Sequence, residues 1–208
     1  MTQQFPPSEF DDWANSYDES VRTDTAFPFD GYDRVLETVV NEAAVSPGDL
    51  VLDLGAGTGN LSALFVERGC QIWGVDFSEK MLQHARHKLP QASFAQADIR
   101  EPLPADFPQH YHAIVSGYTF HHFPLDEKVR LVRRLLTDHL LSGGRLVIGD
   151  LMFRDAADED DLRRAMGEEW EQEFFWLADD AIAALAEAGI ASRFVKISSC
   201  AGVLTVPA

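Results

Sequence analysis

Short apolar runs alternate along this chain with longer segments whose apolar residues recur every three or four positions. Buried strands are predicted where the runs are short, apolar and closed by glycine or an acid, at 50–54, 71–76, 93–99, 111–118 and 145–150. Amphipathic helices are predicted at 31–45, 61–68, 79–89, 126–140 and 179–187. Such alternation is typical of a doubly wound, parallel α/β sheet with right-handed crossovers and helices on both faces.

Three regions depart from this rhythm. At the end of the chain, 192–199 and 202–207 predict a closing hairpin, which would make one terminal strand antiparallel. The interval 153–176 is acidic and ends in three aromatic residues, as a solvated helix tethered by its aromatics would be. Near the start, Phe10, Trp13 and Tyr17 share one helical face, so 8–18 is either a helix packed on the core or a lid over a site.

The stretch LVLDLGAGTGN at 50–60 carries an acid and three glycines at alternate positions, Asp53, Gly55, Gly57 and Gly59. It lies between a predicted strand and a predicted helix, where glycine permits a positive φ and lets a ligand approach the backbone. The following helix directs its first N–H groups at whatever occupies the turn. A dinucleotide fingerprint would place its third glycine at 60, but that residue is Asn60, which counts against NAD.

Acidic residues close the next two predicted strands. Asp76 follows Gly55 by 21 residues and can accept both hydroxyls of a ribose, while Phe77 can stack on an adenine. The next residue, Ser78, can cap the following helix. The acid at the end of 93–99, Asp98, is by itself a weak signal, because aspartate often forms turns.

A histidine pair follows the strand predicted at 111–118, in the sequence FHHF at 120–123. Strands of open α/β sheets bind ligands at their carboxyl ends, and histidine can act as a general base near neutral pH, so His121 and His122 are the candidate catalytic residues. The alternative is that one histidine packs and the other is solvated. Histidine is also a metal ligand, but no acid or cysteine follows at a recognisable spacing, so no metal is predicted.

Four segments resemble known proteins. The pattern Asp53-x-Gly55-x-Gly57-x-Gly59 resembles motif I of the class I S-adenosylmethionine-dependent methyltransferases, and LSGGRLVIGD at 141–150 is similar to their motif III. The phrase WANSYD at 13–18 is similar to the segment that precedes the core in small-molecule methyltransferases, and with YTFHH at 118–122 it resembles the small bacterial YrrT-like group. The resemblance implies a Rossmann-like, doubly wound sheet of seven strands, mostly parallel with one antiparallel edge strand.

The resemblance also implies a function. The cofactor would be S-adenosylmethionine, leaving as S-adenosylhomocysteine after in-line attack by a small-molecule acceptor. The implied cofactor contacts are Trp13, Tyr17, Asp53, Gly55, Gly57, Gly59, Asn60, Asp76, Phe77, Asp98, Ile99 and Ser116. One domain would span 1–208, with an N-terminal lid and helices at 1–45, a cofactor-binding core at 46–152, an insertion over the active site at 153–178, and a helix and hairpin at 179–208. Two alternatives stay open: a regulatory module that binds the cofactor without turnover, and an NAD(P)-dependent oxidoreductase.

Composition narrows the partners and the compartment. The net charge of −17 argues against nucleic acid and anionic membrane surfaces, because such partners require an excess of Lys and Arg. No run of about eighteen apolar residues would span a membrane, and 1–9 lacks the pattern of a signal peptide. Cys70 and Cys200 are therefore expected to be reduced thiols in a cytoplasmic protein of one domain.

Overall fold

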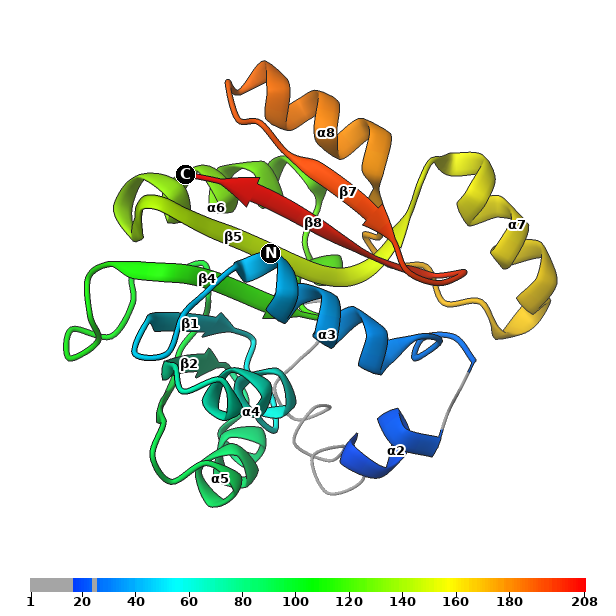
Figure 1. Ribbon diagram of the computed structural model, residues 1–208. Helices are drawn as coiled ribbons and strands as arrows, with labels where there is room; N and C mark the ends of the chain where they lie inside the picture. The colour runs from blue at the N-terminus through cyan, green and yellow to red at the C-terminus, as the bar shows by residue number, and fades with distance from the viewer. Residues whose placement is uncertain (1–16, 24–25) are drawn as a thin grey trace.

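The computed structural model describes residues 17–23 and 26–208, so Trp13 and most of the helix predicted at 8–18 lie outside the described residues. A mixed sheet crosses the molecule in the order β3-β2-β1-β4-β5-β8-β7, and β6 pairs with the end of β5 (Figure 1). The strands are β1 Leu50–Leu54, β2 Gln71–Asp76, β3 Ser93–Gln96, β4 Tyr111–Gly117, β5 Leu140–Phe153, β6 Trp176–Leu177, β7 Arg193–Lys196 and β8 Ala201–Pro207. The predicted α/β class is confirmed.

The predicted number of seven strands is wrong, because this sheet has eight. The added strand is β6, whose two residues run parallel to the end of β5, with Met152 opposite Trp176. It arises because β5 continues to Phe153, past the predicted end at 150, and so offers free backbone to a returning segment. The antiparallel strand predicted near this edge is confirmed as β8, with β7 paired beyond it.

Two strand ends also differ from the prediction. β5 begins at Leu140 rather than 145, and its register against β4 shifts between Tyr111 and Ala113. β3 ends at Gln96 rather than 99, so Asp98 and Ile99 lie in the loop after the strand.

Helices cover both faces of the sheet, as the alternation of strands and helices predicts (Figure 1). Side chains alternate in direction along each strand, so Val51 packs with α3 (Tyr32–Ala43) and α4 (Asn60–Glu67), while Leu52 packs with α6 (Leu125–Asp138) and α8 (Ala178–Glu187). The remaining helices are α2 Tyr17–Thr23, α5 Glu79–Lys88, α7 Ala156–Met166, and the short η1 Phe120–His122 and η2 Gly167–Glu169. Ser78 caps α5 as predicted, since its hydroxyl accepts the N–H of Met81 at 3.2 Å.

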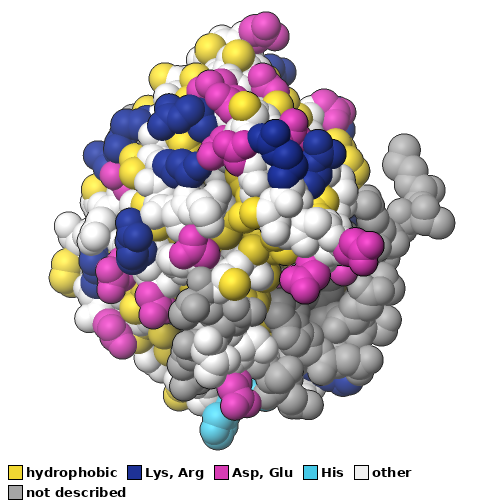
Figure 2. All heavy atoms as spheres, turned by 90° about the vertical axis from the view of Figure 1, so that its right-hand side faces the viewer, with side chains coloured by type: hydrophobic (Ala, Val, Ile, Leu, Met, Phe, Trp, Pro, Cys, Tyr) yellow, Lys and Arg dark blue, Asp and Glu magenta, His cyan; other side chains and the backbone are white. Residues whose placement is uncertain are grey.

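The surface near α7 carries charges of both signs. Figure 2 shows acidic and basic side chains intermixed over the face that lies to the right in Figure 1. On α7, Arg163 pairs with Asp160 at 2.7 Å, and Arg164 pairs with Asp161. The basic groups that the sequence places together on this helix are thus offset locally by acids, as solvated helix faces commonly are.

The structure bears on the predictions about the cysteines and about membrane spans. Cys70 and Cys200 are both buried free thiols. Over 17–23 and 26–208, none of the helices is both long enough and apolar enough to cross a bilayer.

Candidate functional site

A cavity of about 570 Å³ opens at the carboxyl ends of β1, β2, β4 and β5. The strand order reverses between β1 and β4, and open α/β sheets bind ligands in the crevice at that switch point. Its walls come from the turn after β1, the end of β2, the segment after β4, α2, and residues between 166 and 173. The cavity therefore collects segments from across the whole sequence.

The glycine turn forms one wall of the cavity, and its glycines are needed for different reasons. Gly55, Gly57 and Gly59 all have positive φ, at 72°, 52° and 83°. A Cβ on Gly55 would lie 2.1 Å from Oγ1 of Thr119, so the fold itself requires glycine there. Within 17–23 and 26–208, and apart from its own chain neighbours, no atom lies within 4 Å of where a Cβ on Gly57 would be, and Gly57 lines the cavity. The cradle at Gly57 is thus open to a ligand.

Asp76 stands at the end of β2 and faces this turn. Its Oδ2 accepts the N–H of Gly57 and its Oδ1 accepts the N–H of Ser78, each at 2.8 Å. Burial raises the pKa of Asp76 to about 6, although these hydrogen bonds oppose the shift. A carboxylate oxygen can accept more than one hydrogen bond, so Asp76 retains acceptor capacity for ligand hydroxyls. Phe77 lies beside it in the same wall.

Asp53 lies behind the turn and is 1% exposed. Its Oδ2 accepts the hydroxyl of Ser62 at 2.6 Å, which ties β1 to α4. Its Oδ1 is buried and, among the described residues, has no hydrogen-bond partner. Burial raises the pKa of Asp53 to about 7, with the negative charge of Asp76 adding to the shift. Asp53 is not one of the residues lining the cavity.

This pKa predicts a pH-dependent stability. Because the folded pKa of Asp53 is about 7, against about 3.9 when unfolded, the folded state binds the extra proton between those values. The free energy of unfolding should therefore fall as pH rises through this window, by up to about 4 kcal/mol from this residue. Asp53→Asn should flatten the decline that urea unfolding measures between about pH 5 and about pH 8. Exposed Asp106→Asn is the control, and an unchanged slope in the Asp53 variant contradicts the assignment.

The helix α2 closes one side of the cavity through Tyr17. The next residue, Asp18, accepts the hydroxyl of Thr58 at 2.6 Å, the amide of Asn60 at 3.0 Å and the ammonium of Lys88 at 2.8 Å. These bonds join α2 to the glycine turn, α4 and α5. Asn60 is engaged here and is not one of the lining residues.

Several other predicted contacts also lie away from the lining. Asp98 is held by Nε of Arg100, at 2.9 and 3.0 Å from its two oxygens. Ile99 is a core residue, and the hydroxyl of Ser116 donates to the carbonyl of Leu54 at 2.7 Å. Gly59 is the N-cap residue of α4, and a Cβ on it would lie 3.2 Å from the Cβ of Ala85. The predicted residues that do line the cavity are Tyr17, Gly55, Gly57, Asp76, Phe77, His121 and His122.

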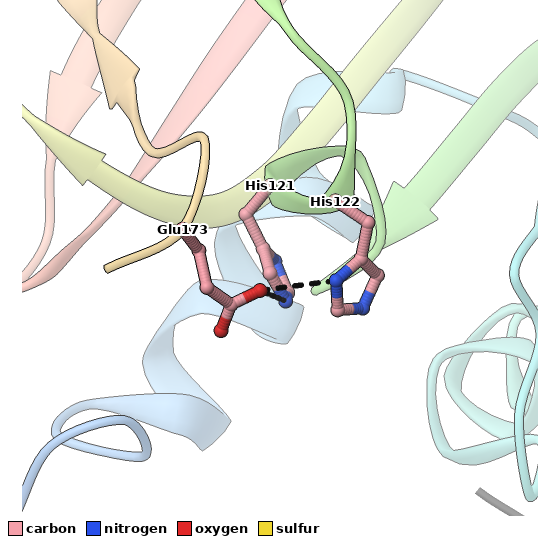
Figure 3. A group of neighbouring side chains, drawn as sticks. All are labelled: His121, His122 and Glu173. Carbon is pink, nitrogen blue, oxygen red and sulfur yellow. Dashed lines mark hydrogen bonds and ion pairs between the residues drawn. The ribbon is translucent and has the colours of Figure 1, made fainter. Parts of the chain in front are cut away.

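The histidine pair lies on η1, directly after β4, and both rings line the cavity. Nδ1 of His121 is 2.5 Å from Oδ1 of Asp150, and Oδ2 of that buried carboxylate accepts the indole N–H of Trp176 at 3.0 Å. Glu173 reaches both rings from the loop before β6 (Figure 3). Its Oε2 is 3.0 Å from Nδ1 of His122 and 3.8 Å from Nε2 of His121.

The two imidazoles have different electrostatic surroundings. Burial lowers the pKa of His121, but the charge and hydrogen bond of Asp150 outweigh it, so the net shift is upward. Burial and the neighbouring His121 lower the pKa of His122. The carboxyl of Asp150 is buried, which favours its neutral form, yet His121 holds its pKa below the usual range.

Lys128 is a residue of this region that the sequence reasoning missed. It is 1% exposed, its ammonium donates to the carbonyl of Phe174, and it lies 4.3 Å from the ring centroid of Trp176. Burial lowers its pKa to about 8. A signal was present, because Lys128 falls on the apolar stripe of α6 with Leu131, Val132 and Leu135. A lysine at a core position of a helix indicates a buried polar contact.

Tyr118 was also not assigned a role from the sequence. It has a positive φ of 54°, which is uncommon outside glycine, and it lines the cavity. Its ring stacks on Tyr32 with centroids 5.1 Å apart. Its hydroxyl is buried and has no hydrogen-bond partner within the described part of the chain. A positive φ outside glycine and a buried hydroxyl without a partner are features that cluster at ligand-binding sites.

Known proteins resemble this chain at two levels. The family described as "Methyltransferase domain" matches residues 51–144. An uncharacterised methyltransferase of Geobacillus sp. (strain WCH70) is 36% identical over 176 residues, covering 82% of this chain and 78% of the relative. These matches do not test the finer resemblance to the YrrT-like group, which stays a prediction.

Solved structures share the fold at lower identity. Magnesium protoporphyrin IX methyltransferase (ChlM) from Synechocystis PCC 6803, with bound S-adenosylhomocysteine, has a TM-score of 0.70 at 21% identity and covers 97% of this chain and 99% of its own. The [4+2]-cyclase SpnF has a TM-score of 0.74 at 16% identity, covering 99% and 96%. Two differently named activities on one fold mean that the reaction must be argued from the site.

Proposed function

Because this chain belongs to the class I S-adenosylmethionine-dependent methyltransferases, we propose that it methylates a small-molecule acceptor held in the cavity at the β1/β4 switch point. S-adenosylmethionine is the cofactor, and when bound it supplies an electrophilic methyl group. The observation that carries the proposal is that the glycine turn and the histidine pair line one cavity. Donor and acceptor can therefore meet there, and positioning of this kind is a major source of rate in such transfers.

The turn side of the cavity fits the cofactor. Gly57 leaves its backbone open, Asp76 has acceptor capacity for ribose hydroxyls, and Phe77 offers a ring for the adenine. Asp53 supports this side from behind, through Ser62. The contacts expected from Gly59, Asn60, Asp98, Ile99 and Ser116 stay proposals, since these residues are not among those that line the cavity. The contact expected from Trp13 stays a proposal too, because Trp13 lies outside the described residues.

The histidine side suits the acceptor. His121 and His122 face the cavity together with Glu173, and the segment 166–173 closes that end. In the simplest mechanism, one of the imidazoles accepts the proton that the acceptor loses as its methyl bond forms. A cavity of about 570 Å³ is in the range of small-ligand sites, which supports a small acceptor. The buried free thiols support a reducing compartment, and we place the protein in the cytoplasm.

The ribose assignment can be tested at Asp76. We expect Asp76→Ala to weaken binding of S-adenosylhomocysteine by about 100-fold, because two hydrogen bonds to a charged acceptor are lost. Isothermal titration calorimetry measures this, with the exposed Asp106→Ala as control and urea unfolding as the check on folding. Unchanged affinity in a folded Asp76 variant would contradict the ribose role.

The lid role of α2 depends on Asp18. Asp18→Asn removes the charge that holds Lys88 and weakens the bonds to Thr58 and Asn60. We expect the dissociation constant for S-adenosylhomocysteine to rise about tenfold, because Tyr17 would no longer be held in the wall. The matched control is Glu19→Gln, on the next residue of the same helix. Equal affinities in both variants would argue against a closing role.

Turnover itself separates the three functional classes. The protein is incubated with methyl-labelled S-adenosylmethionine and a metabolite extract, and S-adenosylhomocysteine and labelled product are followed by mass spectrometry. Extract-dependent production of both supports the proposal and identifies the acceptor. Tight binding of S-adenosylhomocysteine without turnover in any extract would instead favour a regulatory module. Thermal stabilisation by NAD but not by S-adenosylhomocysteine would favour an oxidoreductase.

A further inference from the structure

We propose that His121, His122 and Glu173 bind a divalent zinc-type cation, which holds the nucleophile of the acceptor in the methyl-transfer cavity. The inference rests on the proposed function and adds a metal site to it. Two imidazoles and one carboxylate form a ligand set typical of zinc sites that keep one position open for water or substrate. We refer to these three residues as the His–His–Glu cluster.

The distances within the cluster suit one shared ion. Each residue offers a ligand atom, and these atoms lie within 4.8 Å of one another. Oε2 of Glu173 is 3.0 Å from one imidazole nitrogen and 3.8 Å from the other (Figure 3). Ligands of a tetrahedral ion with bonds of about 2.0–2.2 Å are separated by about 3.3–3.6 Å, which lies between these two values. Side-chain rotations that shorten the longest separation, which is at most 4.8 Å, would bring all three atoms into coordination.

The surroundings of His121 support the same role. Its Nε2 faces Glu173 while its Nδ1 contacts the buried carboxylate of Asp150 at 2.5 Å. Histidines that bind a metal through one nitrogen commonly donate the other N–H to a carboxylate, which fixes the ring and the tautomer. Asp150 is itself held by the indole of Trp176, so it is a positioning residue for His121.

Two hydrogen bonds hold the backbone next to Glu173, one from the N–H of Phe174 and one to its carbonyl. The N–H of Phe174 donates to the carbonyl of His121 at 3.0 Å, and Lys128 donates to the carbonyl of Phe174. The carboxylate therefore approaches the two imidazoles on a backbone segment that is tied to η1 and to α6. A loop residue held in this way loses little additional freedom when it coordinates an ion.

The cluster also has access to a substrate. All three residues line the cavity that contains the glycine turn, so a remaining coordination position can face an acceptor. A bound divalent cation favours the deprotonated form of a coordinated thiol or hydroxyl. The acceptor class is thus a small molecule whose nucleophile is an ionisable thiol or hydroxyl.

The group transfer balances without a redox partner. The acceptor loses its proton to water on coordination. Its sulfur or oxygen then forms a bond to the methyl carbon, and the methyl–sulfur bond of the cofactor breaks. That electron pair stays on sulfur, which leaves neutral S-adenosylhomocysteine and the methylated acceptor. In this form the imidazole nitrogens are ligands, and the general-base role of the simplest mechanism is not needed.

Metal binding can be measured on the protein without any acceptor. Untagged protein is stripped with a chelator and titrated with Zn²⁺ by calorimetry, and mass spectrometry gives the metal content after dialysis. We expect one zinc per chain, with affinity at least about 100-fold weaker in Glu173→Gln and in His122→Gln. Glu171→Gln is the matched control, since it removes a neighbouring cavity carboxylate outside the cluster, and its zinc affinity should be unchanged. Mg²⁺ should not compete, because it prefers oxygen ligands.

Two readouts keep the outcomes distinct. Every variant is also titrated with S-adenosylhomocysteine, which checks that the cavity is folded. Normal S-adenosylhomocysteine binding without stoichiometric zinc, or with equal zinc affinity in wild type, Glu173→Gln and His122→Gln, would overturn the metal site and leave the methyltransferase proposal standing. Failure of the wild-type chain to bind S-adenosylhomocysteine would instead contradict the proposed function.

Discussion

Gly57→Ala is expected to weaken S-adenosylhomocysteine binding by at least about 100-fold while the protein stays folded. Apart from its own chain neighbours, no atom of the described residues lies within 4 Å of where this Cβ would be, and Gly57 lines the cavity, so the added methyl group would take space that we assign to the ligand. The cost to folding is limited to placing alanine at a φ of 52°, which amounts to about 1–2 kcal/mol. Calorimetry and urea unfolding measure the two effects separately.

Substitutions at two other glycines serve as comparisons for Gly57→Ala. Gly143 also has a positive φ, 81°, and no atom in the described part of the chain, its own neighbours apart, lies within 4 Å of its Cβ position, but it does not line the cavity. Gly143→Ala should therefore cost similar stability and leave binding intact. Gly55→Ala should disrupt folding, because its Cβ would lie 2.1 Å from Thr119. Equal binding by the Gly57 and Gly143 variants would show that the turn does not seat the cofactor.

His122→Gln is expected to lower kcat by about 100-fold with little change in S-adenosylhomocysteine affinity. The side chain lies on the acceptor side of the cavity, 3.0 Å from Glu173, and glutamine cannot replace it as a base or as an imidazole ligand. Both catalytic roles considered for the pair therefore predict the loss. Steady-state turnover with the acceptor identified by labelling measures it, beside calorimetry of the cofactor product.

The exposed His110→Gln is the control for this substitution. His121→Gln should lose activity as well, and circular dichroism must accompany it because His121 is buried against Asp150. Full activity in both cluster variants would remove the histidine pair from catalysis.

Local patterns predicted most of the fold. The short apolar run of β1 and the helical stripe on α6 are properties of neighbouring residues, and both elements appear where they were expected. The turn at Gly55, Gly57 and Gly59 could also be predicted, because glycine is the residue that adopts a positive φ most readily and these three glycines do so. The eighth strand was not visible, since two residues at 176–177 form a strand only where β5 extends far enough to pair with them.

The candidate site divides in the same way. The sequence correctly placed Asp76 and the histidine pair at the ends of strands, where parallel topology brings them to one edge. The sequence also predicts Asn60 and Asp98 as cofactor contacts, which stays a prediction, and it did not show that these side chains bond to Asp18 and Arg100. Competition among side chains for the same polar partners depends on packing, which spacing along the chain does not report.

Neighbouring residues were enough to predict the fold class, the glycine turn after β1 and the place of the histidine pair after β4, because each depends on dihedral preferences and periodicities of adjacent residues. Which groups surround that pair could be seen only once the chain was folded. Glu173 lies 51 residues after His122, and Asp150 lies 29 residues after His121. Their approach results from the long β5, the return through β6 and the buried Lys128. Contacts over such separations follow from how the elements pack together, and no local pattern contains them.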